Sequence, residues 1–358
     1  MKEKNYFTQR NIENLEKIRI LRKELPPFCS EFIVGIETRT SPLTRLGYCY
    51  DLRIFFDYLI SENVYFDGKN IKDITIQDLE NVTSTDIELF MEYLSSYEFD
   101  GNHYQNSLKT KARKLSTVRA FFKYFYNKDK LQRDVASKVS TPKLHDKPII
   151  RLDNDEIDEM LGIVDSGITL SEHQSSYHSI TRLRDLAILT LFLGTGIRIS
   201  ELVGINIDDI DFENNAFKIT RKGGNETILY FSDEVKYALY DYYIERINDN
   251  TIRKDEKAFF ISMQKKRIGV RAVELLVKKY ASLATPLKHI TPHKLRSTYG
   301  TNLYRETKDI YVVAEVLGHR DVNTTKKHYA AISEDIKRDA SDKVILRKTT
   351  LLRNDENE

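Results

Sequence analysis

The chain has 358 residues, of which 41% are hydrophobic and 31% charged, and its formal net charge is +2. This length allows two domains, each with its own hydrophobic core. The sequence has no run of about 18 apolar residues and no apolar signal-peptide core, so we expect a cytoplasmic protein without a membrane partner. Its two cysteines, Cys29 and Cys49, exclude a disulfide framework and a four-thiolate metal site.

The N-terminal third of the chain is predicted to be helical. A first helix is expected from about Asn11 to Leu25, where Pro26 ends it. Thr85 and Glu88 have the spacing of a capping box that starts a later helix. Three segments, the second of which follows this capping box, place apolar residues on one helix face: Leu52, Phe55, Phe56 and Leu59; Ile87, Phe90, Met91 and Leu94; Val118, Phe121, Phe122 and Phe125. The sequence therefore predicts a helical, SAM-like bundle over residues 1–128.

The last of these helices carries a cluster of basic residues with no acid among them. Its members are Lys109, Lys111, Arg113, Lys114, Arg119 and Lys123. A local basic cluster matters more for binding nucleic acid than the total charge does. We therefore expect the first five to contact DNA phosphates from the face opposite the aromatic residues. The alternative is an ordinary solvated helix face.

A linker is predicted over residues 129–150, which contain Pro142 and Pro148 and few large apolar side chains. The second domain then covers residues 151–358. In its first part the sequence predicts a polar loop over 166–181, followed by an apolar helix from about Arg184 to Leu193 that belongs in a core.

Two apolar, β-branched segments form the clearest strand signal in the chain. They are Ala216–Thr220 and Thr227–Phe231, and the Lys222–Asn225 segment between them has the composition of a hairpin turn. Ala258–Ser262 is a candidate third strand. Since the rest is helix and turn, including a terminal helix over 332–346, the expected fold is mainly α with a small antiparallel β-sheet.

Side chains that favour anions recur through the second domain. Arg198 follows a glycine pair, Lys222 lies in the hairpin turn, His293 and Arg296 lie one helical turn apart, and His319 follows Gly318. Arginine offers a planar fork that matches phosphate oxygens in pairs. Two arginines are suited to hold a phosphodiester and to stabilise the charge of its transition state. No acidic cluster with metal-ligand spacing lies near them, so we expect neither a metal nor a cofactor.

A nucleophile for this phosphate is supplied by Tyr329, ten residues after His319. A phenol titrates near pH 10, so it needs a base and a positive field to attack at neutral pH. His293 is suited to take its proton, and Lys222 to protonate the leaving oxygen. Each residue alone has an ordinary structural explanation, such as a surface arginine, a helix-end histidine or one tyrosine among 21. Their occurrence together after a basic helical domain is what favours catalysis.

These stretches together resemble the tyrosine recombinase/integrase family over essentially the whole chain. The family's arginine box is similar to Gly194–Leu202, its hairpin lysine to Lys222, and its His-x-Leu-Arg box to His293–Arg296. Its Leu-Gly-His box is similar to Leu317–His319, and its nucleophile matches Tyr329. The N-terminal bundle resembles the core-binding domain, which in the family clamps DNA together with the catalytic domain.

The resemblance implies a role for each matched residue. Arg198, Arg296 and His319 bind the scissile phosphate, Lys222 protonates the 5′-oxygen, His293 serves as acid and base, Tyr329 forms a 3′-phosphotyrosine, and Glu201 supports Arg198. It also implies a homotetramer on double-stranded DNA that exchanges strands through a Holliday junction.

Within the family the chain is most similar to the Xer type, and particularly the XerS type, through its length, its Thr220–Gly224 hairpin and its loop at 166–181. That similarity implies a dif-like inverted repeat as the target, a role in resolving chromosome dimers, and a division-associated DNA translocase as a partner. An integrase or resolvase of a mobile element is the main alternative. A type IB topoisomerase and a DNA-binding protein without catalysis are the others.

Overall fold

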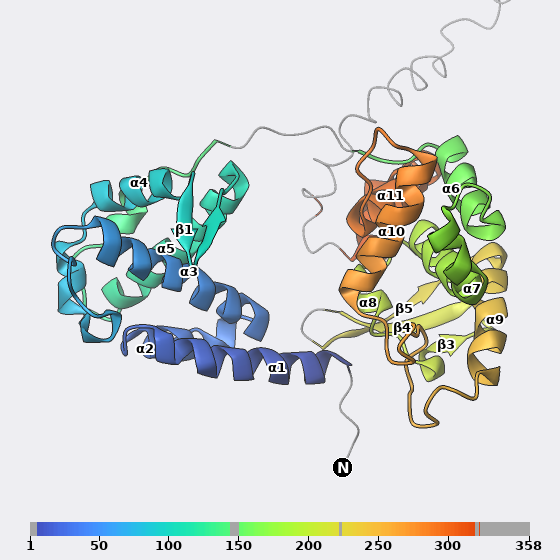
Figure 1. Ribbon diagram of the computed structural model, residues 1–358, viewed down its shortest axis with the longest axis horizontal. Helices are drawn as coiled ribbons and strands as arrows, with labels where there is room; N and C mark the ends of the chain where they lie inside the picture. The colour runs from blue at the N-terminus through green and yellow to red at the C-terminus, as the bar shows by residue number, and fades with distance from the viewer. Residues whose placement is uncertain (1–5, 144–149, 222–223, 319–321, 323–358) are drawn as a thin grey trace, which may run out of the picture. The chain divides into compact units, whose positions relative to one another are not determined.

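The computed structural model describes residues 6–143, 150–221, 224–318 and 322. The chain divides into two compact units, Met1–Lys147 and Pro148–Glu358 (Figure 1). Within the described residues no helix is long and apolar enough to cross a membrane. The predicted terminal helix over 332–346 lies outside these residues.

The first unit is a helical bundle with one small hairpin (Figure 1). Its helices are α1 (Tyr6–Leu21), α2 (Cys29–Gly35), α3 (Pro42–Glu62), α4 (Ser84–Tyr93) and α5 (Leu108–Tyr126), and its strands are β1 (Tyr97–Phe99) and β2 (Asn102–Tyr104). Short 3-10 helices cover Arg22–Glu24, Glu37–Arg39, Ile71–Asp73, Gln77–Asn81 and Val135–Lys138. This confirms the predicted helical architecture.

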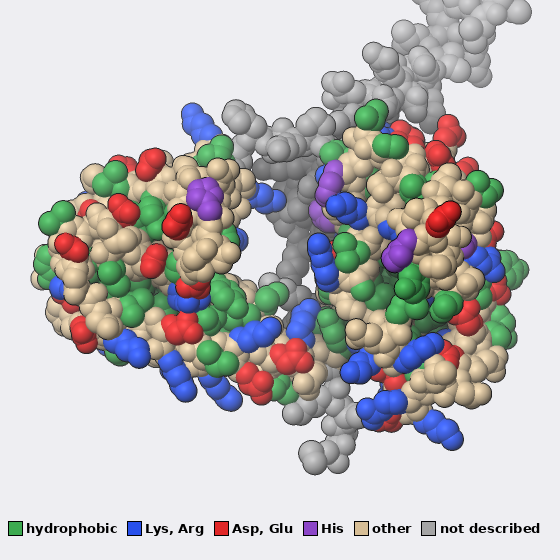
Figure 2. All heavy atoms as spheres, in the orientation of Figure 1, with side chains coloured by type: hydrophobic (Ala, Val, Ile, Leu, Met, Phe, Trp, Pro, Cys, Tyr) green, Lys and Arg blue, Asp and Glu red, His purple; other side chains and the backbone are tan. Residues whose placement is uncertain are grey.

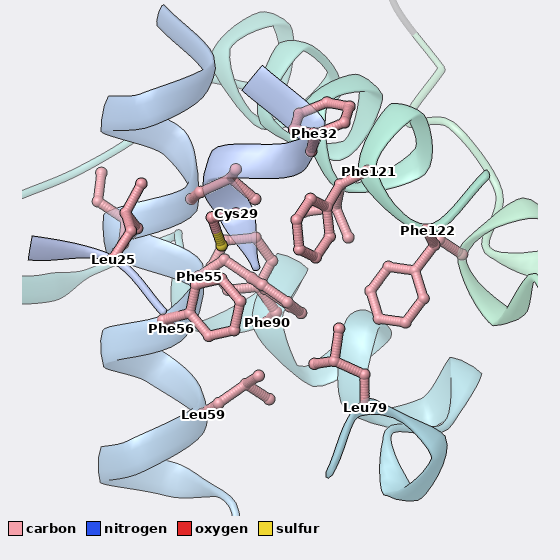
Figure 3. Packing of buried hydrophobic residues seen from close by; sticks show 14 of the residues in the cluster. Leu25, Cys29, Phe32, Phe55, Phe56, Leu59, Leu79, Phe90, Phe121 and Phe122 are labelled. Carbon is pink, nitrogen blue, oxygen red and sulfur yellow. The ribbon is translucent and has the colours of Figure 1, made fainter. Parts of the chain in front are cut away.

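Aromatic side chains from α2, α3, α4 and α5 form the core of this unit (Figure 3). Phe55 of α3, Phe90 of α4 and Phe122 of α5 are fully buried. The Phe55 and Phe90 rings meet edge to face, with their centroids 5.1 Å apart. Such pairs contribute about 0.5–1.5 kcal/mol beyond the area that they bury. The helical spacing seen in the sequence therefore identified the faces that pack.

Two predicted helix starts in this unit were wrong. Helix α4 begins two residues earlier than predicted, because its capping box is Thr83 and Asp86 rather than Thr85 and Glu88. Asp86 Oδ2 accepts the Thr83 N–H at 2.7 Å, and Asp86 Oδ1 also accepts a hydrogen bond from Asn63. Helix α1 begins at Tyr6 and not at Asn11.

The segment between the two units is shorter than the linker predicted over residues 129–150. Leu131, Val135, Ala136 and Val139 are buried in the core of the first unit. Arg119 of α5 holds this segment by donating hydrogen bonds to the Ala136 and Val139 carbonyls. The first part of the predicted linker is therefore part of the helical unit.

A buried acid joins α3 to α5. Asp51 is 1% exposed and accepts hydrogen bonds from Arg113 at 2.5 and 2.7 Å, from Lys114 at 3.3 Å and from the Thr117 hydroxyl at 2.7 Å. Lys114 is itself 5% exposed. Burial lowers its pKa, and the Asp51 carboxylate opposes that shift. The Asp51 carboxylate is therefore the counter-charge of this buried ammonium.

Asp51→Ala is expected to destabilise the first unit by about 3–5 kcal/mol, because it leaves Lys114 buried without a counter-charge. Urea unfolding of the full chain, followed by circular dichroism, measures the loss. Adding Lys114→Met to Asp51→Ala should restore part of the stability, because no unpaired charge then remains. A loss below about 1 kcal/mol would show that the cluster is not what joins these helices.

The second unit packs helices around a three-stranded sheet (Figure 1). Its helices are α6 (Asn154–Ser166), α7 (Glu172–Thr195), α8 (Ile199–Leu202), α9 (Asp233–Asn248), α10 (Val270–Ala284), α11 (Pro292–Thr307) and α12 (Ile310–Leu317). Its strands are β3 (Ile210–Asp211), β4 (Ala216–Thr220) and β5 (Glu226–Tyr230), antiparallel in the order β3-β4-β5. The predicted hairpin is confirmed, with Ile219 opposite Thr227.

The third strand of this sheet is Ile210–Asp211, so the prediction of Ala258–Ser262 was wrong. That segment makes isolated bridges instead, from Ala258 to Asn206 and from Ile261 to Arg267. Its four apolar residues are all buried, without the alternation of a sheet with one wet face. An apolar run of this length therefore indicated burial rather than a place in the sheet.

Helix α7 also differs from the prediction, because it includes most of the expected loop over 166–181. Ser171 caps it, accepting the Gln174 N–H at 3.3 Å. His178, in this polar stretch, is 9% exposed, and one of its ring nitrogens lies 2.7 Å from the Val164 carbonyl oxygen. The polar residues therefore extend the apolar helix by three turns rather than form a loop.

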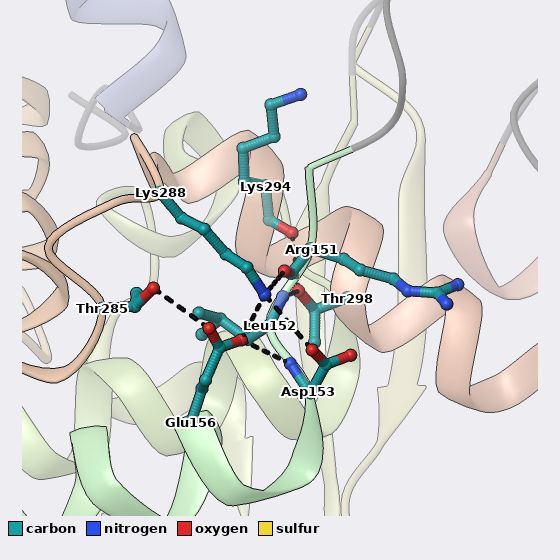
Figure 4. Close-up of polar contacts among 8 residues, drawn as sticks. All are labelled: Arg151, Leu152, Asp153, Glu156, Thr285, Lys288, Lys294 and Thr298. Atoms are coloured by element: carbon teal, nitrogen blue, oxygen red, sulfur yellow. Dashed lines mark hydrogen bonds and ion pairs between the residues drawn. The ribbon is translucent and has the colours of Figure 1, made fainter.

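The start of the second unit is held by an ion-pair network (Figure 4). Lys288 Nζ lies 2.6 Å from Glu156 and 3.2 Å from Asp153, and the Leu152 N–H donates to Thr298 of α11 at 3.0 Å. Burial opposes the charged form of Glu156, but the hydrogen bonds from Lys288, the Asp153 N–H and Thr285 outweigh it. The pKa of Glu156 is therefore lowered from 4.5.

A lowered pKa makes this network stabilising at neutral pH. The contribution is complete above the unfolded pKa of Glu156, near 4.5, and is lost as the pH falls through the lowered folded pKa. Glu156→Gln should therefore lower the melting temperature at pH 7 and lower it less at pH 3. Glu159→Gln, an exposed position on the same helix, is the matched control. An equal effect of Glu156→Gln at both pH values would show that its charge is not responsible.

Candidate active site

Arg198 lies at the turn between α7 and α8. Gly196 ends α7 with φ +61°, and a Cβ on it would lie 2.5 Å from the Tyr299 ring and 2.8 Å from Leu317. Only glycine fits both the left-handed backbone and this close approach. Arg198 then starts α8, and its backbone N–H and Nη1 donate to the Glu201 carboxylate at 3.0 and 2.9 Å.

Glu201 is 4% exposed, whereas the Arg198 side chain is 36% exposed. The buried carboxylate therefore holds Arg198 while part of the arginine side chain stays exposed.

Arg296 lies one turn into α11 and is only 6% exposed. Its Nη1 donates to the Gly196 carbonyl at 2.5 Å, and its Nη2 donates to the Leu317 carbonyl. The same guanidinium therefore joins the end of α7 to the end of α12. His293 is exposed in the first turn of α11, where Pro292 occupies the first position of the helix.

Arg221 is a third arginine at this place, and the sequence reasoning missed it. Its Nη2 donates to the Val316 carbonyl at 3.2 Å. A Cβ at Gly318 would lie 2.2 Å from Arg221 Nη1, so the guanidinium packs directly against that glycine. Burial lowers the pKa of Arg221, Glu201 opposes that effect, and Arg198 adds to it.

Three successive carbonyls at the end of α12 thus each accept from a different arginine. Val316 bonds Arg221, Leu317 bonds Arg296, and Gly318 bonds Arg198, the last at 2.9 Å. The Glu201 carboxylate accepts from one of these guanidinium groups, that of Arg198. Three positive charges around one carboxylate leave an excess that favours an anion.

The remaining predicted catalytic residues, Lys222, His319 and Tyr329, lie outside the described residues. Among the residues that are described, no group of three or more His, Cys, Asp or Glu side chains is placed to hold a metal ion. The described part of the site is therefore Arg198, Glu201, His293 and Arg296, together with Arg221.

The predicted DNA-contact residues of α5 fall into two groups. Lys109 is exposed, and Lys111 is half-buried with its Nζ 2.5 Å from the Ser95 hydroxyl. Arg113 is half-exposed while it holds Asp51. Lys114 is buried on that same acid, so its prediction as a DNA contact was wrong, whereas Arg119 is half-buried and donates to residues 136–141.

Basic side chains do not form one continuous surface on the face shown in Figure 2. Acidic side chains are interspersed with them on that face.

Comparison with protein families gives two matches. Residues 151–335 match the phage integrase family, and residues 33–129 match the phage integrase N-terminal SAM-like domain. Among curated relatives, the tyrosine recombinase XerC of Caldanaerobacter subterraneus is 33% identical over 326 residues, covering 86% of each chain. The tyrosine recombinase XerS of Lactococcus lactis is 32% identical over 350 residues, covering 91% of this chain and 97% of its own.

Solved structures share the fold. The XerH site-specific recombinase, in a post-cleavage complex with its palindromic difH substrate, matches with a TM-score of 0.64 and 20% identity, over 84% of this chain and 80% of its own. The Tn1549 transposon integrase, in complex with transposon right end DNA, matches with a TM-score of 0.61 and 18% identity, over 88% and 98%. The chain therefore belongs to the phage integrase family and is a tyrosine recombinase, a DNA strand-transferring enzyme.

Proposed function

We propose that the protein is a site-specific recombinase of Xer type that cuts and rejoins DNA through a 3′-phosphotyrosyl intermediate. The observation that carries this proposal is the convergence of Arg198, Arg221 and Arg296 on the end of α12. The proposed phosphate ligand His319 follows this point directly in the chain.

The proposed reaction begins when the Tyr329 oxygen attacks the scissile phosphorus. His293 takes the phenolic proton, the bond from phosphorus to the 5′-oxygen breaks, and Lys222 protonates that oxygen. Arg198, Arg296 and His319 stabilise the added charge of the transition state. Reversal with a different 5′-hydroxyl joins the DNA to a new partner, so no phosphate-bond energy is lost and no ATP is needed.

The biological role proposed is the resolution of chromosome dimers. XerS of Lactococcus lactis aligns over 91% of this chain, which supports a recombinase of Xer type. We propose that the protein acts as a homotetramer on a dif-like inverted repeat. A cytoplasmic location and a division-associated DNA translocase as partner belong to the same proposal. The alternative is an integrase of a mobile element, which the fold shared with the Tn1549 integrase keeps open. A dif-like repeat beside a lone gene favours the first role, and flanking element ends favour the second.

The test is to trap the wild-type protein on DNA. A binding site is first selected from genomic duplexes, and a duplex with a nick beside the cleavage position is then made, so that the released end diffuses away. We expect a covalent complex that survives denaturing gels and a peptide map with the adduct on Tyr329. Tight binding without any covalent product would contradict recombination and favour a DNA-binding protein without catalysis.

Lys109→Ala and Lys111→Ala are each expected to weaken binding to the selected duplex and to lower its dependence on salt. A phosphate contact releases about one counterion, so the slope of log K against log salt should fall by about 0.9 for each lysine. Lys254→Ala in the second unit, a position outside the proposed contact set, is the control. An unchanged slope would remove these lysines from the DNA interface.

A further inference from the structure

We propose that Arg221 is a positioning residue for the acid step assigned to Lys222, an inference that rests on the proposed function. Arg221 directly precedes Lys222, and Gly318 directly precedes His319. Arg221 contacts Val316 and Gly318. This contact therefore joins the residue before Lys222 to the residue before His319.

The backbone of Arg221 closes the β4–β5 turn. Its N–H donates to the Asn225 carbonyl at 2.8 Å, and its carbonyl accepts from the Gly224 N–H at 3.0 Å. Gly224 has φ +86°, a conformation that favours glycine. Arg221 is therefore bonded through its backbone to Gly224 and Asn225, the first two described residues after it.

The side chain of Arg221 fixes this turn to α12. Besides its bond to Val316, its guanidinium occupies the space that a side chain at Gly318 would fill. Its Nε is buried and has no hydrogen-bond partner among the described residues. A buried donor without a partner costs stability, so the presence of Arg221 here is better explained by what it positions than by what it contributes to folding.

Changing the leaving atom from oxygen to sulfur distinguishes a positioning role of Arg221 from a purely structural one. A 5′-oxygen needs a proton as its bond to phosphorus breaks, whereas a sulfur at that bridging position leaves as a thiolate. A thiol has a pKa of about 8.5, so the sulfur substrate needs no acid. Loss of a correctly placed acid should therefore slow cleavage of the oxygen substrate and not of the sulfur substrate.

The experiment compares wild type, Arg221→Met and Lys222→Ala on both duplexes, and measures the rate of covalent complex formation. A general acid contributes about 100- to 10,000-fold, so a misplaced one should cost Arg221→Met about 10- to 100-fold on the oxygen substrate. We expect the defect to shrink to a few-fold with sulfur, as for Lys222→Ala, while the DNA dissociation constant is unchanged. Arg253→Met, which removes an exposed arginine paired with Asp255, should behave as wild type.

Two results would overturn the inference. One is an equal defect of Arg221→Met on both substrates, which would place Arg221 on the phosphate or in folding. The other is the absence of any defect. If Arg221→Met does not fold, Arg221→Lys gives the same comparison with a smaller change, because it keeps the charge but loses the fork. A wild-type protein that forms no covalent complex on either duplex would instead contradict the proposed function itself.

Discussion

The Tyr329→Phe variant is expected to bind its DNA site as tightly as the wild-type protein and to form no covalent complex with it. The substitution removes one oxygen atom, which is the proposed nucleophile, and keeps the ring. The arginine cluster at the end of α12 is unchanged by it, so the positive charge that favours a phosphate remains. Gel shifts measure the dissociation constant, and denaturing gels of the nicked duplex measure the covalent product.

The same substitution at a different tyrosine is the control for Tyr329→Phe. Tyr311 of α12 is 70% exposed and lies 18 residues before Tyr329, so Tyr311→Phe should cleave at the wild-type rate. Covalent DNA in the Tyr329→Phe variant would show that another of the 21 tyrosines attacks, and a peptide map would identify it. Loss of DNA binding in that variant would show that the phenol contributes to binding rather than to chemistry.

The helical core of the first unit could be predicted because its signal is local. Phe55, Phe90 and Phe122 repeat at helical spacing and are all fully buried. The start of α7 has a local signal too, the capping box of Ser171 and Gln174, but the polar stretch after it has no apolar helical spacing. His178 is polar in the sequence, and its burial depends on the Val164 carbonyl of α6, which lies in a different helix.

The site shows the same division between local and distant information. Arg198 and Glu201 are three residues apart, so their pairing was visible in the sequence. The bond from Arg221 to Val316 spans 95 residues, and no spacing in the chain indicates it. Its one sequence signal is its place directly before the hairpin lysine.

Basic residues on α5 give the converse case. Lys114 was expected to face DNA, yet its partner Asp51 lies 63 residues earlier, in another helix. A run of like charges predicts a solvated face only when no acid from elsewhere in the fold reaches it. The sequence therefore identified the basic helix but not which of its residues are available to a ligand.

Arg296→Lys is expected to reduce the rate of covalent complex formation by about 100- to 1,000-fold, the size of effect seen when one preorganised donor to a transition state is removed. Lysine keeps the charge, but it has no planar fork. It is therefore unable to bond the Gly196 and Leu317 carbonyls together as Arg296 does. A neutral residue such as Gln would remove the charge as well as the fork, so it would not distinguish the effect of the charge from that of the fork.

The structural part of this effect is measured separately, because Arg296 is buried between α7 and α12. A carbonyl left unbonded in a buried place costs about 1–3 kcal/mol, so the Arg296→Lys protein should melt at a lower temperature. Cleavage is therefore compared well below its melting temperature. Arg271→Lys, an exposed arginine paired with Glu274 on α10, is the matched control. If Arg296→Lys melts lower but cleaves within a few-fold of wild type, Arg296 joins two helix ends without acting on the phosphate. A loss of cleavage much larger than the loss of folded protein places its guanidinium at the reacting group.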